Sequence, residues 1–286
     1  MAKIIWLASY PKSGNTWFRV FLANLREAKD TPVEINGLNT AFFASARNLF
    51  DEATGLESSD LTLEEIERLR PEIYHYLAEQ ADEDLFLKIH DAYTDTNENS
   101  PMFPKSATRC AIYFLRNPLD VAVSFAHHSG WDFDTAIAKM ACNETCLCDD
   151  QMKPYNQLRQ KLLSWSNHVK SWTEKPEFDV CPIRYEDMQM DPLNTFKRAL
   201  DFAGLSYNAR DVEKALELSS FEELQKQEKE KGFNEKDPNT ILFFRKGKIA
   251  AWREELNERQ VRRILRDHEE VMLRFGYLDH NRNPVF

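Results

Sequence analysis

The sequence predicts an α/β fold in which helices flank a central parallel sheet in three layers. Four short apolar segments have the length and composition of buried strands, and helical patterns lie between them. Apolar strands that alternate with helices are typical of parallel sheets covered on both faces. The predicted strands are Lys3–Ala8, Asp84–Ile89, Cys110–Leu115 and Asp179–Tyr185. Pro182 places the last strand at a sheet edge or at a bulge, because proline cannot donate to the ladder.

Length and composition fit a single domain over residues 1–286, because 42% of the residues are hydrophobic and can form a sizeable core. The formal net charge of −10 argues against binding to nucleic acid or to an anionic membrane surface. No window is apolar over the roughly 18 residues that a membrane span needs. The chain enters its first strand without a secretory signal, so we expect a cytoplasmic protein. Five cysteines, an odd number, favour free thiols in a reducing compartment.

Helical periodicity predicts helices between and after the strands. Thr62 and Glu65 form a capping-box pattern at the start of one helix, and Pro71 should kink or restart it. The predicted helices cover residues 62–81, 120–129, 155–173, 192–203, 209–218 and 254–275. Residues 31–59, 94–108 and 225–239 have the composition of variable insertions, and the last is either a solvated helix end or a lid.

The first strand ends in the loop Ser9–Trp17, which carries Lys12, Gly14 and hydroxyl side chains where a helix begins. Unpaired backbone N–H groups and the helix dipole make such a loop an anion site, and phosphate is the obvious anion. The strand, loop and helix are P-loop-like, but the loop is not a Walker A motif. No glycine precedes Lys12, and the lysine comes before Gly14. An ATP or GTP site is therefore the weaker interpretation.

Chemically active side chains also follow the other three strands. Lys88 and His90 lie at the end of the second strand, Arg116 follows the third with Ser124 two helical turns later, and Tyr185 ends the fourth. Ligands of parallel α/β sheets bind at the carboxyl ends of the strands. We therefore expect these residues to share one sheet edge with the anion loop, where a histidine is a candidate general base.

Taken in order, these motifs resemble those of sulfotransferases that use 3′-phosphoadenosine 5′-phosphosulfate (PAPS). Tyr10–Trp17 resembles the family's 5′-phosphosulfate loop, and Lys88–His90 resembles the segment that holds the catalytic base. The other matching segments are Tyr113–Ser124, Arg184–Met188, Ser219–Phe221 and Phe244–Gly247. Ala250 stands in place of a family glycine, and the dimer motif of many animal cytosolic members is absent, which leaves the oligomeric state open. The C-terminal pattern is more similar to bacterial natural-product sulfotransferases.

The resemblance implies a role for each site residue. Lys12 would stabilise charge on the leaving oxygen, His90 would take the acceptor's proton, and Lys88 would support the sulfuryl oxygens or position His90. The implied PAPS-binding residues are Lys12, Ser13, Gly14, Asn15, Thr16, Trp17, Arg116, Ser124, Tyr185, Phe221, Arg245, Lys246 and Gly247. The adenine would be held by Trp17, Tyr185 and Phe221, and the 3′-phosphate by Arg116, Ser124 and Arg245. No metal is required, because cationic side chains replace Mg²⁺.

The acceptor is expected to be a small molecule, and the sequence leaves open its identity and whether oxygen or nitrogen is sulfated. Its expected lining covers residues 41–50, 91–96, 127–133 and 142–152. The side chains considered there are the aromatics Phe42, Phe43, Tyr93, Trp131 and Phe133 and the carboxylates Asp91, Asp95, Asp132, Asp134, Asp149 and Asp150. This mixture favours a cationic or polyhydroxylated acceptor, such as a guanidinium alkaloid or a glycoside.

Three alternatives remain for the function: a P-loop nucleotide kinase, sulfation of a carbohydrate or lipid, and a binding module without turnover. Cys142, Cys146 and Cys148 lie near His127 and His128, but their spacing is not that of paired zinc ligands. A partly buried segment with reduced thiols is the simpler interpretation of this cluster.

Overall fold

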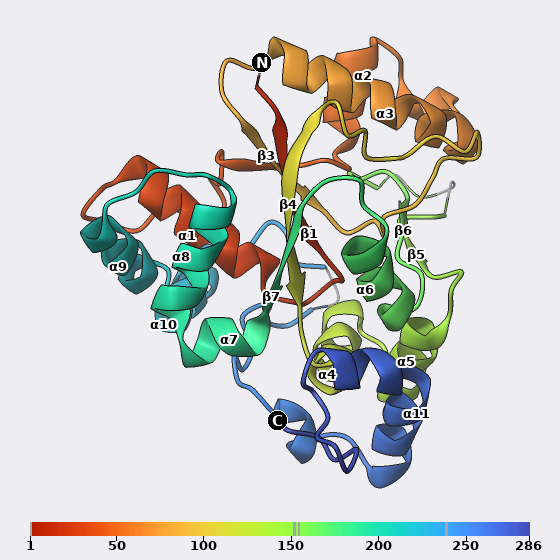
Figure 1. Ribbon diagram of the computed structural model, residues 1–286, viewed down its shortest axis with the longest axis vertical. Helices are drawn as coiled ribbons and strands as arrows, with labels where there is room; N and C mark the ends of the chain where they lie inside the picture. The colour runs from red at the N-terminus through yellow and green to blue at the C-terminus, as the bar shows by residue number, and fades with distance from the viewer. Residues whose placement is uncertain (1, 151–152, 154, 238–239) are drawn as a thin grey trace. The chain divides into compact units, whose positions relative to one another are not determined.

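The computed structural model describes residues 2–150, 153, 155–237 and 240–286, and its chain divides into two compact units (Figure 1). The first unit comprises residues 1–10, 41–113 and 143–182, and the second comprises residues 11–40, 114–142 and 183–286. One five-stranded sheet has the strand order β2-β3-β1-β4-β7, and a two-stranded sheet pairs β5 with β6. Strands β4 and β7 pass from the first unit into the second.

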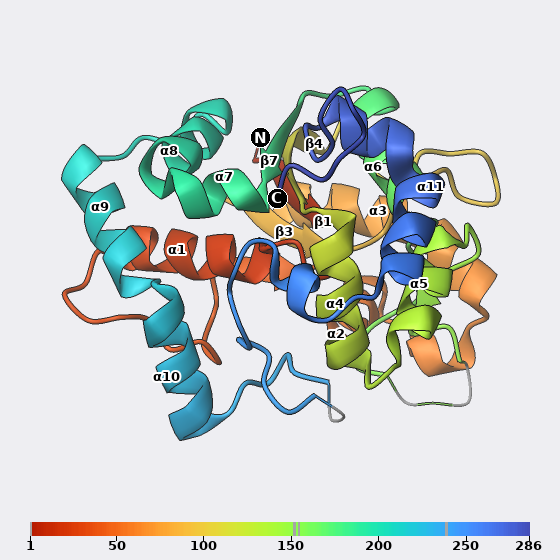
Figure 2. The same ribbon diagram turned by 90° about the horizontal axis from the view of Figure 1, so that it is seen from below.

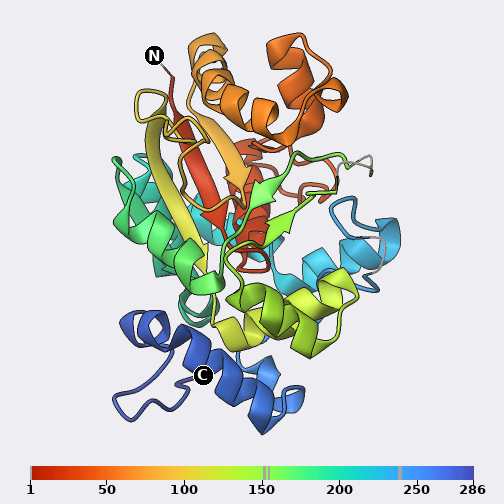
Figure 3. The same cartoon turned by 90° about the vertical axis from the view of Figure 1, so that its right-hand side faces the viewer.

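The four predicted strands are confirmed as β1 (Ile4–Ser9), β3 (Leu85–Ile89), β4 (Thr108–Leu115) and β7 (Val180–Arg184). β7, which contains Pro182, lies at a sheet edge as its proline predicted. The short strand β2 (Ala41–Phe43) pairs in parallel with β3. β1 also pairs in parallel with β3, with Ala8 opposite Ile89, so their carboxyl ends lie side by side (Figure 3).

An aromatic layer connects the sheet to two helices of the first unit, α3 (Leu63–Gln80) and α6 (Trp165–Glu174). Trp6 of β1 packs edge-on against Tyr74 of α3, with ring centroids 4.9 Å apart, and against Phe103 at 5.0 Å. Phe103 contacts Trp172 of α6, which stacks on Tyr113 of β4. The unit also contains α2 (Arg47–Thr54), η1 (Ser58–Asp60), β5 (Cys146–Leu147) and β6 (Gln160–Lys161).

The predicted capping box of α3 is confirmed, because the Thr62 hydroxyl accepts from the Glu65 backbone N–H and the Glu65 carboxylate accepts from the Thr62 N–H. The expected restart at Pro71 is wrong, since one helix runs through it. Proline removes a single intrahelical bond. The buried side chains of Ile73 and Tyr74 hold the helix on the core after that point.

The predicted helix over residues 155–173 is too long, because α6 begins only at Trp165. Residues 160–161 pair as strand β6 with β5 instead. Leu163 has a φ of 59°, which interrupts a right-handed helix, and the Ser164 hydroxyl then caps α6 by accepting from the Asn167 N–H. Helices α2, α5 (Phe133–Ala141) and α7 (Tyr185–Met190) were not predicted, since each is short.

The second unit is mostly helical. Besides α5 it contains α1 (Asn15–Glu27), α4 (Pro118–Ser129), α7 (Tyr185–Met190), α8 (Pro192–Phe202), α9 (Ala209–Leu218), α10 (Phe221–Lys231), η2 (Ala251–Glu254) and α11 (Glu258–Arg274). Helix α1 packs against α9, and α11 packs against α4 and α5 (Figure 2). Phe18 of α1 lies 5.0 Å from Phe114 of β4. Because strand side chains alternate, Phe114 and Tyr113 face opposite sides of β4, so helices cover both faces and the predicted layered fold is confirmed.

Candidate functional site

The loop between β1 and α1 has the backbone geometry of an anion cradle. Lys12 has a φ of 68° and Gly14 a φ of 97°, and α1 begins at Asn15. A Cβ on Gly14 would lie 2.8 Å from the ring of Tyr185, so only glycine fits there. Ser13 is 1% exposed, and its hydroxyl has no hydrogen-bond partner among the described residues. A buried polar group without a partner is costly, so this hydroxyl fits a bound anion.

Arg116 connects the anion loop to two other parts of the second unit. Its guanidinium donates to the backbone carbonyl of Lys12 at 3.3 Å and to that of Lys248 at 3.2 Å. Its Cζ atom lies 4.2 Å above the ring of Tyr185. The side chain is 9% exposed, and its Nε has no partner in the described part of the chain. Three predicted positions from strand ends, Lys12, Arg116 and Tyr185, therefore converge here with Lys248, which follows the predicted C-terminal motif.

The segment Arg245–Ala250 is held at both ends by buried carboxylates. On one side, Glu228 of α10 accepts from the backbone N–H groups of Phe243 at 2.7 Å and Phe244 at 2.8 Å. On the other side, Asp120 of α4 accepts from Ala250 at 2.9 Å and Trp252 at 3.0 Å. Burial raises the pKa of Asp120, and Arg116 and these N–H groups partly offset that rise. The sequence analysis did not assign Glu228, whose only signal is a carboxylate on an apolar helix face.

Aromatic rings pack closely against the two glycines of the site. Gly247 has a φ of 59°, and a Cβ there would lie 2.5 Å from the ring of Phe221 at the start of α10. Tyr185 packs against Trp17, with ring centroids 6.2 Å apart, and donor Gln189 Nε2 lies 2.9 Å from the Tyr185 hydroxyl. Burial raises the pKa of Tyr185. Trp17, Tyr185 and Phe221 thus line the same group of loops, as the prediction of an adenine site requires.

Arg245 and Lys246 make ion pairs with Glu255, a residue that the sequence analysis did not single out. Glu255 Oε1 lies 2.9 Å from Arg245 and 2.8 Å from Lys246, and Oε2 lies 2.6 Å from His127. Partial burial raises the pKa of Glu255, but the bonds from His127, Lys246 and Arg245 outweigh it and lower the pKa to about 2. Glu255 is therefore ionised at neutral pH.

Lys12 and Ser124 are predicted site residues that also lie in the second unit. The Lys12 ammonium lies 3.6 Å above the ring of Phe243, so the aromatic segment before Arg245 also reaches the anion loop. Ser124 lies on α4, half-buried, and shows no hydrogen bond to the other predicted residues in the described part of the chain.

His90 belongs to the first unit and directly follows β3. Its Nδ1 lies 2.8 Å from the Ser9 carbonyl oxygen and 3.2 Å from the Ser9 hydroxyl. A carbonyl oxygen only accepts, so Nδ1 carries the ring proton and the basic lone pair of neutral His90 is on Nε2. The in-register pairing of β1 with β3 produces this contact, because it sets Ser9 beside the end of β3.

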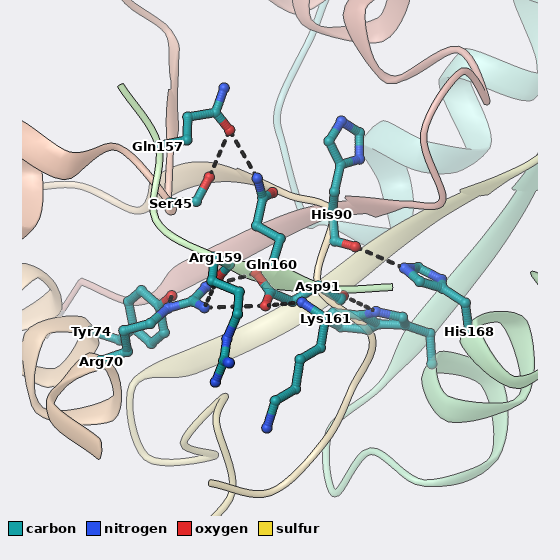
Figure 4. A network of polar contacts seen from close by, with 11 residues as sticks. Ser45, Arg70, Tyr74, His90, Asp91, Gln157, Arg159, Gln160, Lys161 and His168 are labelled. Atoms are coloured by element: carbon teal, nitrogen blue, oxygen red, sulfur yellow. Dashed lines mark hydrogen bonds and ion pairs between the residues drawn. The ribbon is translucent and has the colours of Figure 1, made fainter. Parts of the chain in front are cut away.

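A second histidine holds the backbone of His90. His168 Nε2 donates to the His90 carbonyl at 3.0 Å (Figure 4). The Tyr113 hydroxyl donates to His168 Nδ1 at 2.8 Å. Burial lowers the pKa of His168 to about 4, so this ring is neutral at pH 7. Tyr10 packs edge-on against His168 at 5.3 Å. His168 lies mid-helix on α6 and gave no sequence signal of its own.

Lys88 is 6% exposed, and its ammonium lies 4.1 Å above the ring of Phe43. The two predicted residues of β3 therefore lie in the first unit, whereas the predicted nucleotide-binding residues all lie in the second.

The expectation that Asp91 lines an acceptor site is wrong. Asp91 is 3% exposed and forms a two-bond ion pair with Arg70, at 2.8 and 3.1 Å (Figure 4). It also accepts from the backbone N–H of Lys161. A charge buried beside His90 needs such a partner, since an unpaired one would be strongly destabilising.

Other expected lining residues have structural roles. Tyr93 is buried in the aromatic layer, Asp132 caps α5, and Asp134 pairs with Arg259 at 2.7 Å. Phe42 is half exposed, and Phe43 lies under Lys88. Residues 151–152 of the expected lining lie outside the described residues, as do residues 238–239 of the segment interpreted as a solvated helix end or a lid.

Among the described residues there is no group of three or more His, Cys, Asp or Glu side chains placed to hold a metal ion. All five cysteines are free thiols. Burial raises the pKa of Cys148 to about 11, so this thiol is protonated at neutral pH. None of the described helices combines the length and apolar character that a membrane crossing requires.

Comparison with known proteins places residues 3–276 in a match to the sulfotransferase domain family model. Among curated relatives, flavonol 3-sulfotransferase of Flaveria bidentis is 26% identical over 280 residues, which covers 91% of this chain and 78% of that protein. Cytosolic sulfotransferase 17 of Arabidopsis thaliana is 25% identical over 290 residues, covering 96% of this chain and 75% of that protein.

The fold is similar to a solved structure of mouse sulfotransferase SULT7A1 in complex with adenosine 3′,5′-bisphosphate (PAP). The TM-score is 0.59 at 23% identity, covering 94% of this chain and 84% of that one. At this identity the likeness supports the fold, and the α/β fold with a parallel sheet expected from the sequence agrees with it.

Proposed function

This chain belongs to the sulfotransferase domain family, and we propose that it transfers a sulfuryl group from PAPS to a small-molecule acceptor. The observation that carries the proposal is Arg116. Its guanidinium bonds both to the loop after β1 and to the loop after Gly247. Two separate cationic loops thus meet at one arginine, as a nucleotide with phosphates at two positions requires.

The proposed nucleotide contacts follow from the chemistry of the loops. The N–H groups at the start of α1, with Ser13 and Thr16, suit the 5′-phosphosulfate. Arg116, Arg245 and Lys246 suit the 3′-phosphate, since arginine offers bidentate donors. The rings of Trp17, Tyr185 and Phe221 suit the adenine. A 3′-phosphate contact is what separates PAPS from ATP, so this set favours sulfuryl over phosphoryl transfer.

We assign the proton transfer to His90. Its Nδ1–H is engaged by Ser9, which leaves Nε2 with the lone pair to accept the proton of an acceptor hydroxyl or amine. Ser9 and His168 fix the ring and its backbone, so the tautomer is set before the acceptor binds. As the proton moves to Nε2, the acceptor atom gains the electron pair that attacks sulfur.

We assign stabilisation of the leaving group to Lys12. Negative charge grows on the oxygen that bridges phosphorus and sulfur as the S–O bond breaks, and an ammonium group offsets it. Lys88 supports the sulfuryl oxygens or positions His90. Both lysines lie over aromatic rings, which hold an ammonium without neutralising its charge.

For the acceptor we propose a cationic or polyhydroxylated small molecule, such as a guanidinium alkaloid or a glycoside. Asp91 does not support this proposal, because Arg70 neutralises its charge. The support rests on the carboxylates of Asp95, Asp149 and Asp150 and on the exposed ring of Phe42. A carbohydrate or lipid acceptor is the alternative, and the flavonol relative makes a phenol a further test case. The five free thiols favour the reducing cytoplasm as the compartment.

The test is an acceptor panel with ³⁵S-labelled PAPS. The panel contains guanidinium alkaloids, glycosides, simple phenols, oligosaccharides and amphipathic lipids. Labelled product from the first two classes supports the acceptor assignment. Activity confined to neutral phenols, sugars or lipids rejects that assignment and keeps sulfuryl transfer, whereas γ-phosphoryl transfer from ATP would reject both.

A further inference from the structure

One carboxylate pairs with two of the three cations that the proposed function assigns to the 3′-phosphate. The same oxygen of Glu255, Oε1, pairs with Arg245 at 2.9 Å and with Lys246 at 2.8 Å. Its other oxygen pairs with His127 at 2.6 Å. Glu255 is 15% exposed, so these pairs are screened less than surface pairs are.

The backbone around Glu255 is fixed close to this position. Glu255 follows η2, and its N–H donates to the Trp252 carbonyl at 3.1 Å. The N–H of Trp252 is itself bonded to the buried Asp120. Glu255 is therefore anchored through Trp252 to the same Asp120 that holds Ala250. A large backbone shift that moved the carboxylate away from Arg245 and Lys246 would break these hydrogen bonds.

A carboxylate and a phosphate recruit the same donors, and two anions beside each other repel. We propose that Glu255 competes with the 3′-phosphate for Arg245 and Lys246, and so sets how tightly the enzyme holds the 3′-phosphate end of its nucleotide. This inference rests on the proposed function. Glu255 acts on binding alone and has no part in the transfer step.

The neighbouring residue provides a matched control. Glu254 also pairs with Lys246, at 2.8 Å, but its side chain is 65% exposed and does not reach Arg245. Exposed pairs of this kind contribute little. If Glu255 competes with the 3′-phosphate for Arg245 and Lys246, removing the charge of Glu255 changes nucleotide affinity, whereas removing the charge of Glu254 does not.

The experiment is calorimetric titration of the wild type, Glu255→Gln and Glu254→Gln with PAP and with AMP, which lacks the 3′-phosphate. We expect Glu255→Gln to bind PAP about tenfold more tightly, a difference of about 1.4 kcal/mol. AMP affinity is expected to be unchanged, and Glu254→Gln to bind both as the wild type does. Thermal unfolding confirms that each variant is folded, and Glu255→Ala serves as a second variant should Glu255→Gln be unfolded.

Equal or weaker PAP binding by the folded Glu255 variant overturns the inference, because the carboxylate would then only order the loop. Equal tightening for AMP also overturns it, since the effect would not involve the 3′-phosphate. If the wild type binds no PAP, the proposed function fails as well. That result is distinct from PAP binding that Glu255 does not affect.

Discussion

The segment Arg245–Ala250 and His90, which follows β3, are both held by hydrogen bonds, but from different kinds of partner. Buried carboxyl groups, those of Glu228 and Asp120, hold the first through its N–H groups. Neutral partners hold the second, a carbonyl of Ser9 and the ring of His168. The difference follows from the chemistry assigned to each. The proposed anion site keeps its cations beside fixed carboxylates, whereas the proposed general base is held in one tautomer.

The carboxylate of Asp91, the residue that follows His90, has a partner of opposite charge. Asp91 directs its carboxylate to Arg70, so the pair adds little net charge beside the histidine (Figure 4). Burial lowers the pKa of His168 to about 4, and this partner therefore stays uncharged at neutral pH. In the other region, the cations Arg245 and Lys246 and the ring of His127 share Glu255 instead.

The largest expected effect tests the histidine region. His90→Ala should lower the turnover number with PAPS by about 10²–10⁴, because the acceptor proton then has no base. PAP affinity should stay as in the wild type, since the nucleotide residues lie on other elements. Steady-state kinetics and PAP titration check both parts, with the exposed His280→Ala as control. Turnover like that of the wild type would remove His90 from the mechanism.

The next effect tests the anion loop as a source of catalysis as well as binding. Lys12→Ala should lower turnover by at least about 10², because charge on the leaving oxygen loses its ammonium partner. Single-turnover kinetics at saturating PAPS separates this loss from weaker binding. A variant that needs more PAPS but turns over at the wild-type rate would make Lys12 a binding residue only.

A smaller effect tests the glycine at the charged loop. Gly247→Ala should weaken PAP binding about tenfold, because the new Cβ meets the ring of Phe221 and the backbone has a φ of 59°. PAP titration measures it, and Gly55→Ala, which has a similar φ of 67° but open space, shows the cost of φ alone. Equal PAP affinity in the Gly247 variant and the wild type would contradict the close packing of Phe221 on this loop.

The last effects are differences in stability between pH windows. The folded-state pKa of His168 is about 4, below the ordinary 6.5, so the unfolded chain binds more protons between these values. His168 should therefore reduce stability as pH falls from 6.5 to 4, by about 1.4 kcal/mol per unit. Glu255 stabilises above pH 4.5, and its contribution is lost as pH falls towards 2.

Denaturant unfolding at a series of pH values measures these windows. His168→Gln should flatten the decline between pH 6.5 and 4, although buried His268 retains part of it, since burial also lowers the pKa of His268 to about 4. Glu255→Gln should lower stability above pH 4.5 and remove the part of the decline that Glu255 causes between pH 4.5 and 2. Identical profiles for the wild type and both variants would refute the contrast between the neutral and charged regions.

The fold and the residues that follow strand ends could be predicted from sequence, because both depend on the order of residues along the chain. Lys12 and Gly14 lie in the loop after β1 and Arg116 follows β4, so the sheet fixes where these residues lie. Asp91 also stands at a strand end, yet its role depends on Arg70, which approaches from a distant helix. Glu255 and His168 depend in the same way on tertiary contacts that no spacing in the sequence indicates.

The central claim is that the chain binds a nucleotide with a 3′-phosphate and uses it without a metal. Titration calorimetry of the wild type with PAP in the absence of Mg²⁺, and with ATP in its presence, tests this most directly. We expect PAP to bind tightly and ATP with Mg²⁺ to bind at least about a hundredfold more weakly, because Arg116 and Arg245 then lose the phosphate that they recognise. Tighter binding of ATP with Mg²⁺ than of PAP would contradict the assignment and favour a nucleotide kinase.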